Sequence, residues 1–261
     1  MKRTLIQPDF SQFPEAYLPL LGKYPVYDSS CSQGARVWFI EGEGGFYLKT
    51  AAEGSLNREA QMTRFFHSKG LGAEVLSYAS GEKDWLLTRA IPGEDCTHRQ
   101  YLDDPRRLCD TTATLLRQLH ETDLSGCPVI DRCGERWESA RKGYEKNFWE
   151  PDLFAGIWEF SSMEEAWAVT ETNGKYLKNE VLLHGDYCLP NVMLDNWRFS
   201  GFIDLGSGGL GDRHFDLLWG SWTLKFNLGT DAYCSRFLDA YGRDKVEPEL
   251  LRTTAAIEIF G

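Results

Sequence analysis

Three oxygen-bearing side chains in the second half of the chain have types and spacing that suit phosphoryl transfer. Asp186 follows the apolar run 181–183, Asn191 comes five residues later, and Asp204 lies in the apolar run 199–205. Carboxylate and amide oxygens suit Mg²⁺, and a carboxylate can accept the proton of an attacking hydroxyl. If the runs are strands joined by a turn at 195–198, all three side chains can lie at one end of a small sheet. The alternative is that they are ordinary turn residues.

The first half of the chain supplies an independent sign of the same chemistry. A kinase-like site needs a lysine on a strand and a glutamate on the following helix. Runs 37–40 and 46–49 predict a β-hairpin in which Lys49 ends the second strand. Residues 55–69 predict a helix with Glu59 on its buried side. A buried carboxylate is costly unless it is paired, so we predict a Lys49–Glu59 ion pair. The alternative is an exposed glutamate.

The motifs His184-Gly185-Asp186, Asn191 and Ile203-Asp204-Leu205-Gly206 together resemble the catalytic core of the aminoglycoside phosphotransferases, a branch of the protein-kinase-like fold. The resemblance implies that Asp186 is the catalytic base and that Asn191 and Asp204 bind Mg²⁺. It also implies that His184 braces the catalytic loop. Asp216, in a segment similar to the family's Asp-Arg-x-x-Asp-Leu, would steady this loop by hydrogen bonds, or would alternatively be a helix residue with no further role.

The resemblance also implies a nucleotide site. Tyr47 shares a strand face with Lys49 and would stack on adenine, with core packing as the alternative. Segment 32–38 matches the phosphate-covering loop, and segment 88–91 would be the hinge whose backbone reads the adenine edge. The remaining nucleotide-binding residues implied in these two segments are Gln33, Gly34, Ala90 and Ile91.

Charge and the terminal segment indicate the acceptor. The net charge is −11, from 28 Lys and Arg against 39 Asp and Glu, which favours a cationic ligand and disfavours nucleic acid and anionic membranes. Segment 257–261 is similar to the ending of aminoglycoside 3′-phosphotransferases, which implies that Glu258 and Phe260 bind substrate, with Glu159 in an acidic insert. Those enzymes usually carry an arginine after the Asp204 motif, where this chain has Ser207-Gly208-Gly209.

The order of elements predicts an α+β, bilobal protein-kinase-like fold. The first ninety residues indicate a small β-sheet crossed by one helix, and segment 91–94 is a break. Helices are then expected at 105–119, 135–147 and 163–179, the last with an interruption near Gly174. Further helices are expected from Asp212 to about 226, from Asp231 to 241, and from Pro248. We therefore predict a nucleotide-binding lobe at 1–92 and a larger, mainly helical catalytic and substrate-binding lobe at 93–261.

These expectations combine into an ATP-dependent and Mg²⁺-dependent transfer of the γ-phosphoryl group to an aminoglycoside hydroxyl, with the 3′-hydroxyl favoured, which would confer antibiotic resistance. We expect a cytoplasmic protein, because no apolar run is long enough to span a membrane and the seven cysteines form no Cys-x-x-Cys pair. A monomer or weak homodimer is expected. The alternatives are a kinase of another hydroxylated molecule, a nucleotide-binding pseudokinase, and a metal-dependent hydrolase.

Overall fold

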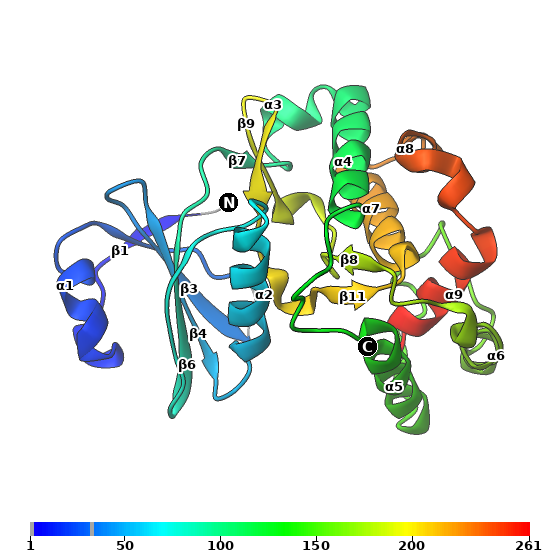
Figure 1. The fold of residues 1–261 in the computed structure, drawn as a ribbon, viewed down its shortest axis with the longest axis horizontal. Helices are drawn as coiled ribbons and strands as arrows, with labels where there is room; N and C mark the ends of the chain where they lie inside the picture. The colour runs from blue at the N-terminus through cyan, green and yellow to red at the C-terminus, as the bar shows by residue number, and fades with distance from the viewer. Residues whose placement is uncertain (1–2, 32–33) are drawn as a thin grey trace. The chain divides into compact units, whose positions relative to one another are not determined.

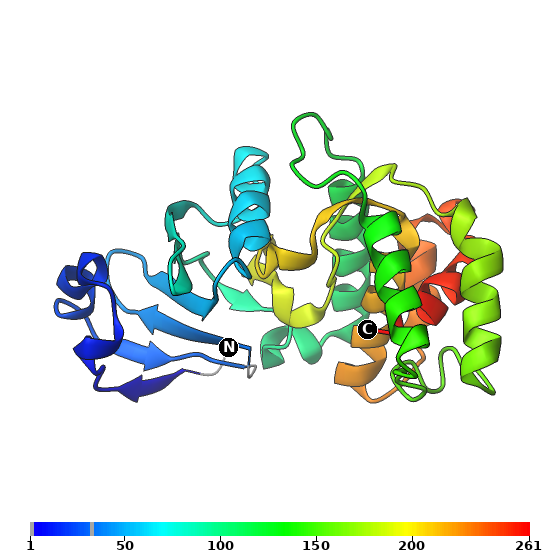
Figure 2. The same cartoon turned by 90° about the horizontal axis from the view of Figure 1, so that it is seen from below.

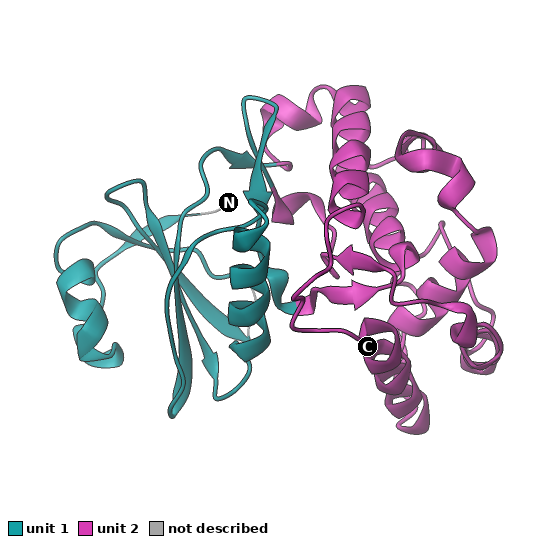
Figure 3. Cartoon of the chain, in the orientation of Figure 1, with its two compact units in different colours: residues 1–95, 193–206 teal, residues 96–192, 207–261 magenta. Residues whose placement is uncertain are grey.

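Two compact units make up the chain in the computed structural model, which describes residues 3–31 and 34–261. One unit comprises residues 1–95 together with 193–206, and the other comprises 96–192 together with 207–261 (Figure 3). The predicted lobes, 1–92 and 93–261, differ from these units mainly in segment 193–206, which packs with the first unit. No helix in the described part of the chain has the length and apolarity needed to cross a membrane.

An antiparallel sheet of six strands, counted over the described residues, forms the centre of the first unit in the order β1-β2-β3-β4-β6-β5. The strands are β1 (Thr4–Ile6), β2 (Val26–Asp28), β3 (Ala35–Ile40), β4 (Phe46–Ala52), β5 (Val75–Ala79) and β6 (Lys83–Arg89). The predicted hairpin is confirmed, because β3 pairs with β4 and sets Val37 opposite Lys49. Lys49 does not end the second strand, however, since β4 continues to Ala52. The strands β1 and β2 were not predicted from the sequence.

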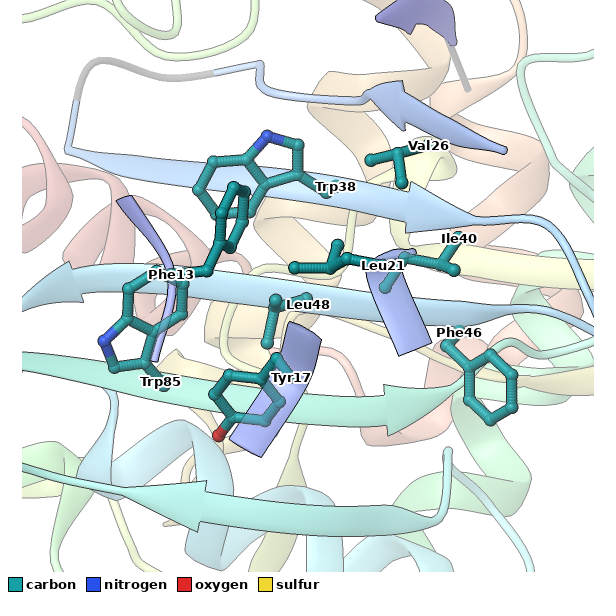
Figure 4. Packing of buried hydrophobic residues seen from close by; sticks show 9 residues of the cluster. All are labelled: Phe13, Tyr17, Leu21, Val26, Trp38, Ile40, Phe46, Leu48 and Trp85. Carbon is teal, nitrogen blue, oxygen red and sulfur yellow. The ribbon is translucent and has the colours of Figure 1, made fainter. Parts of the chain in front are cut away.

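Alternate residues of β4 face opposite sides of this sheet. One side carries an apolar cluster, shown in Figure 4: Phe13, Tyr17, Leu21, Val26, Trp38, Ile40, Phe46, Leu48 and Trp85. The short helix α1 (Leu18–Leu21) lies on that side of the sheet. Helix α2 (Asn57–Ser68) packs on the opposite side, where its Ala60 contacts Leu86 of β6 (Figure 1). Lys49 lies opposite Leu86 in the register of β4 and β6, so its side chain is on the α2 side.

A second hairpin brings Asp204 to the first unit. Strands β9 (Val192–Asp195) and β10 (Arg198–Phe202) are joined by Asn196 and Trp197, both at positive φ, 49° and 67°, as a tight two-residue hairpin turn requires. Strand β7 (Glu94–Asp95) pairs with β9, and the Phe202 amide donates to the Leu71 carbonyl at 2.8 Å. Strand β10 ends at Phe202, so Asp204 follows the predicted strand 199–205 instead of lying within it.

Helices make up most of the second unit. They are α3 (Arg99–Leu102), α4 (Pro105–His120), α5 (Arg132–Glu145), α6 (Met163–Asn173), α7 (Arg213–Leu228), α8 (Cys234–Gly242) and α9 (Pro248–Glu258). Helix α7 packs against α4, α8 and α9 (Figure 2). A short antiparallel pair, β8 (Val181–Leu183) with β11 (Gly209–Gly211), flanks the motif His184-Gly185-Asp186.

Two predicted helix starts in this unit, those of α5 and α8, are wrong. Helix α5 begins at Arg132 rather than 135, because Asp131 caps it by accepting from the Gly134 amide at 2.9 Å. The predicted interruption near Gly174 is confirmed, because α6 ends at Asn173 and a separate 3-10 turn, Gly174–Tyr176, follows it instead of a helix that continues to 179. Helix α8 begins at Cys234, and Asp231 is not its cap.

Candidate active site

Lys49 is held by two carboxylates within the first unit. Its Nζ lies 2.7 Å from Glu59 Oε2 and 3.1 Å from Asp204 Oδ1, so the predicted Lys49–Glu59 ion pair is confirmed. Burial opposes the charge on Lys49, but the attraction of Glu59 and Asp204 outweighs it and raises the pKa above its usual value. The lysine therefore remains a cation at neutral pH and is held in one place.

The position of Glu59 is set by a buried carboxylate on β6. Asp84 is fully buried and accepts from the backbone amides of Gly54 at 3.0 Å and Leu56 at 2.8 Å. These amides lie just ahead of α2, so Asp84 anchors the start of the helix that carries Glu59. Asp84 also accepts hydrogen bonds from the hydroxyl groups of Ser80 and Tyr78. Burial alone would raise the pKa of Asp84, but these hydrogen bonds outweigh burial and lower it.

Asp204 occupies a backbone conformation that L-residues seldom adopt. Its φ is +58°, which is in the left-handed region, and such conformations cost about 1–3 kcal/mol unless the surroundings impose them. About half of its side chain, 54%, is exposed. One carboxylate oxygen binds Lys49, and the carboxylate remains open to an additional partner. Strain of this kind is concentrated at functional positions.

The other predicted nucleotide residues of the first unit have varied surroundings. Tyr47 is half-buried, lies 5.2 Å from the Phe39 ring, and accepts a hydrogen bond from Arg3 Nη2 at 2.8 Å. Gly34 is exposed, and a Cβ there would meet nothing within 4 Å. Ala90 and Ile91 follow β6 and are half-buried, with the Ala90 amide bound to the Gly45 carbonyl at 3.0 Å. Gln33 lies outside the described residues.

Asp186 and Asn191 are joined directly in the second unit. Asn191 Nδ2 donates to Asp186 Oδ2 at 2.9 Å and to the Asp186 carbonyl at 3.0 Å. This use of Nδ2 leaves Oδ1 of Asn191 as the atom that can bind a cation. Among the residues that the structure describes, no three His, Cys, Asp or Glu side chains gather as metal ligands.

Asp216 makes the predicted hydrogen bonds to the loop that begins at His184. Its two oxygens accept from the backbone amides of His184 and Gly185, both at 2.8 Å. The Nδ1 atom of His184 accepts from the Asp186 amide at 3.3 Å, and the ring is fully buried. The turn that presents Asp186 is thus fixed from the side of α7.

His120 is a further residue that supports Asp216, and the sequence analysis assigned no role to it. Its Nε2 lies 3.2 Å from Asp216 Oδ2 and its Nδ1 lies 2.8 Å from the Tyr241 hydroxyl. Burial lowers the pKa of His120 below 6.5, so the ring is neutral, with Nε2–H donating to Asp216 and Nδ1 accepting from Tyr241. Although burial opposes the charge of Asp216, hydrogen bonds led by that from His120 lower its pKa.

We predict that His120 makes the protein less stable as pH falls from 7 to 5. In the unfolded chain its imidazole binds a proton near pH 6.5, whereas the folded chain keeps it neutral, so stability is lost as pH falls through that value. The slope from this single group is at most about 1.4 kcal/mol per pH unit. Urea unfolding at several pH values, on the native protein and on His120→Gln, measures it. Equal pH dependence in both proteins would contradict the assignment.

The three predicted substrate residues differ widely in exposure. Phe260 is 1% exposed and packs edge-on against Tyr144 and Trp167, so its ring is a core group. Glu258 forms an ion pair with Arg136 and accepts from Trp219 Nε1 at 3.0 Å. Glu159 is exposed and accepts from the Gly156 amide at 3.3 Å. Of the three, Glu159 is the carboxylate open to solvent.

Arg136 is the other supporting residue that the sequence analysis missed. A signal for it was present, because α5 buries Cys133, Ala140 and Gly143, and position 136 falls on that same stripe. A charged residue on a buried stripe requires a partner. The partner, Glu258, is 122 residues away in the chain, which a single sequence does not reveal.

Comparisons with known proteins agree with this geometry. The model of the family described as "Phosphotransferase enzyme family" matches residues 32–253. A Lactococcus lactis protein named "Probable aminoglycoside 3'-phosphotransferase" is 45% identical over 254 residues, which cover 97% of each chain. An aminoglycoside 3'-phosphotransferase of Niallia circulans is 26% identical over 95% of this chain and 97% of its own.

Solved structures give the same fold. A crystal structure of a type VIII aminoglycoside-3'-phosphotransferase has a TM-score of 0.71 at 25% identity and covers 92% of this chain and 96% of its own. An aminoglycoside phosphotransferase of Streptomyces rimosus, solved with ADP and streptomycin, has a TM-score of 0.71 at 23% identity and covers 97% of this chain and 99% of its own. The predicted α+β, protein-kinase-like fold is confirmed by these similarities.

Proposed function

Since this chain belongs to the phosphotransferase enzyme family, we propose that it transfers the γ-phosphoryl group of ATP to a hydroxyl of an aminoglycoside, at the 3′ position. The observation that carries the proposal is 45% identity over 97% of the chain to a relative with that name. The side chains that the reaction needs are present, and within each unit they are connected by hydrogen bonds. These are Lys49, Glu59 and Asp204 in the first unit, and Asp186 and Asn191 in the second.

Asp186 would act on the acceptor. Its carboxylate accepts the proton as the hydroxyl oxygen attacks the γ-phosphorus, the bond from that phosphorus to the bridging oxygen breaks, and ADP leaves with the electron pair. The proton then passes from Asp186 to solvent. Asn191 keeps the carboxylate oriented through its Nδ2 hydrogen bond. Because this transition state is loose, positioning and charge stabilisation supply most of the rate enhancement.

Lys49 would bind the phosphates of ATP as a fixed cation, and the backbone around Gln33 and Gly34 would cover them. Tyr47 would pack on the adenine, with Ala90 and Ile91 at its edge. The amide oxygen of Asn191 and the exposed carboxylate of Asp204 are hard donors of the kind that Mg²⁺ prefers, so we assign Mg²⁺ to them. Held by these residues, Mg²⁺ would supply positive charge that offsets the charge of the phosphates.

The acceptor is proposed to be a polycation, in agreement with the net charge of −11. Glu159, exposed in the loop before α6, is the residue that we assign to a substrate ammonium group. We propose that the reaction takes place in the cytoplasm, where ATP is available. The seven cysteines are free thiols, as is usual in a reducing compartment.

Expression in an aminoglycoside-susceptible bacterium tests this proposal. We expect the minimum inhibitory concentration of kanamycin to rise, and the Asp186→Asn variant to give no protection at equal expression. If tolerance is unchanged although protein purified from the same cells turns over ATP, the aminoglycoside acceptor is refuted. The phosphotransferase assignment is then unaffected. Absence of any nucleotide turnover would refute both.

A further inference from the structure

Arg136 is a buried cation that touches the catalytic loop. Its Nη2 donates to the Gly185 carbonyl, its Nη1 pairs with Glu258, and its guanidinium lies 4.8 Å from the centre of the Phe215 ring. Its side chain is 11% exposed. The Nε–H has no acceptor among the described residues. Burying a guanidinium group with one donor unsatisfied costs free energy, so its presence here requires an explanation.

Gly185 is held from both sides as a result. Its amide donates to Asp216 on α7 at 2.8 Å, and its carbonyl accepts from Arg136 on α5. Its φ is +83°, and a Cβ would lie 1.9 Å from the Ser207 carbonyl oxygen, so only glycine fits. Because Asp186 is the next residue, the direction of its side chain depends on this clamped peptide. Asp216 supplies one half of the clamp and Arg136 supplies the other.

Both carboxylate oxygens of Glu258 are used in contacts with neighbouring side chains, one of them Arg136. One oxygen binds Arg136, the other accepts from Trp219 Nε1 at 3.0 Å, and the side chain is 9% exposed. The Arg136 cation therefore balances its charge. A substrate ammonium group would have to compete with a guanidinium that is already in place. Glu258 joins α9 to α5 and α7 and is poorly placed to attract a cation from solvent.

We propose that Arg136 is a positioning residue that fixes the Gly185 carbonyl and thereby Asp186, and that Glu258 acts through Arg136 instead of binding a substrate ammonium group. This inference rests on the proposed phosphotransferase function. It replaces the sequence-based assignment of Glu258 with a different role. Burial lowers the pKa of Arg136 to about 10, against the attraction of Asp216 and Asp186, so the residue is a cation throughout the neutral range.

Steady-state kinetics with ATP and kanamycin separate the two roles of Glu258. If it supports Arg136, Glu258→Gln lowers kcat about tenfold and leaves both KM values within about twofold. Arg136→Gln lowers kcat roughly a hundredfold, as expected for a displaced catalytic group, and the double variant is no worse than Arg136→Gln alone. Arg136→Lys recovers part of the lost kcat, because an ammonium group retains the positive charge and can donate a hydrogen bond.

A direct ammonium ligand would behave differently. Glu258→Gln would then raise the KM for kanamycin about tenfold or more with kcat unchanged, and its effect would multiply with that of Arg136→Gln. Either result would overturn the proposal. Arg141→Gln is the matched control, since Arg141 lies on the same helix and is 34% exposed. If Arg136→Gln does not fold, Arg136→Lys combined with Glu258→Gln carries the same additivity test.

Amide hydrogen exchange tests the clamp without any acceptor. Deuterium uptake in a peptide covering residues 184–188 should be faster in Arg136→Gln and Glu258→Gln than in the native protein, and unchanged in Arg141→Gln. Equal uptake in all four proteins would overturn the positioning role. This readout remains valid if the protein phosphorylates no aminoglycoside, so failure of the proposed acceptor and failure of the clamp are distinguishable.

Discussion

Replacement of Asp186 by asparagine is expected to lower kcat roughly a thousandfold while the fold stays intact, since loss of a positioned general base costs about 10²–10⁴-fold. The asparagine oxygen can still accept from Asn191 Nδ2, which now donates to Asp186 Oδ2 at 2.9 Å. The backbone amides of the turn remain bound to Asp216. The variant therefore removes the proton acceptor and little else, and the KM for ATP should hardly change.

Initial rates of ADP formation with kanamycin, at several concentrations of both substrates, measure this effect. Asp103→Asn is a suitable control, because Asp103 is an exposed carboxylate at the end of α3 in the same unit. Thermal unfolding should give the same midpoint for Asp186→Asn and the native protein. If Asp186→Asn kept a kcat within about threefold of the native value, Asp186 would not be the base.

Lys49→Met is expected to raise the KM for ATP far more than the KM for the acceptor. The ammonium group of Lys49, held by Glu59 at 2.7 Å and Asp204 at 3.1 Å, is the group that we assign to the phosphates. Loss of a charge-assisted contact of about 1.5–3 kcal/mol corresponds to a ten- to hundredfold weaker interaction. A larger rise in the acceptor KM would show that Lys49 serves a different ligand.

The same substitution also removes the partner of a largely buried carboxylate, so it has a stability effect that must be separated from binding. Glu59 is 12% exposed, and leaving a buried group without its partner costs about 1–3 kcal/mol. Lys49→Met combined with Glu59→Gln should recover stability and leave the KM for ATP high. Lys83→Met, at an exposed lysine on β6 of the same sheet, should change neither quantity.

Local patterns were sufficient to predict part of the site. Strand alternation places Lys49 on one side of β4, and the apolar stripe of α2 places Glu59 on its buried side. Both groups lie ten residues apart, within one strand–turn–helix unit, so short-range rules determine that they meet. The same holds for Asn191 and Asp186, five residues apart on one loop.

Other parts depend on contacts that short-range patterns do not encode. His120 meets Asp216 across 96 residues, and Arg136 meets Glu258 across 122. Strand β11 is formed by Gly209–Gly211, and glycine has low strand propensity, so only pairing with β8 reveals it. The placement of Glu258 shows a further limit, since an acidic residue similar to a family's substrate ligand proves to be paired internally.

Mass spectrometry of kanamycin after incubation with the purified protein, ATP and Mg²⁺ shows whether the protein phosphorylates this aminoglycoside. We expect one added phosphoryl group per kanamycin, one ADP formed for each, no product when Mg²⁺ is chelated, and almost none with Asp186→Asn. ATP consumed while kanamycin keeps its mass, or equal product from Asp186→Asn, would contradict it.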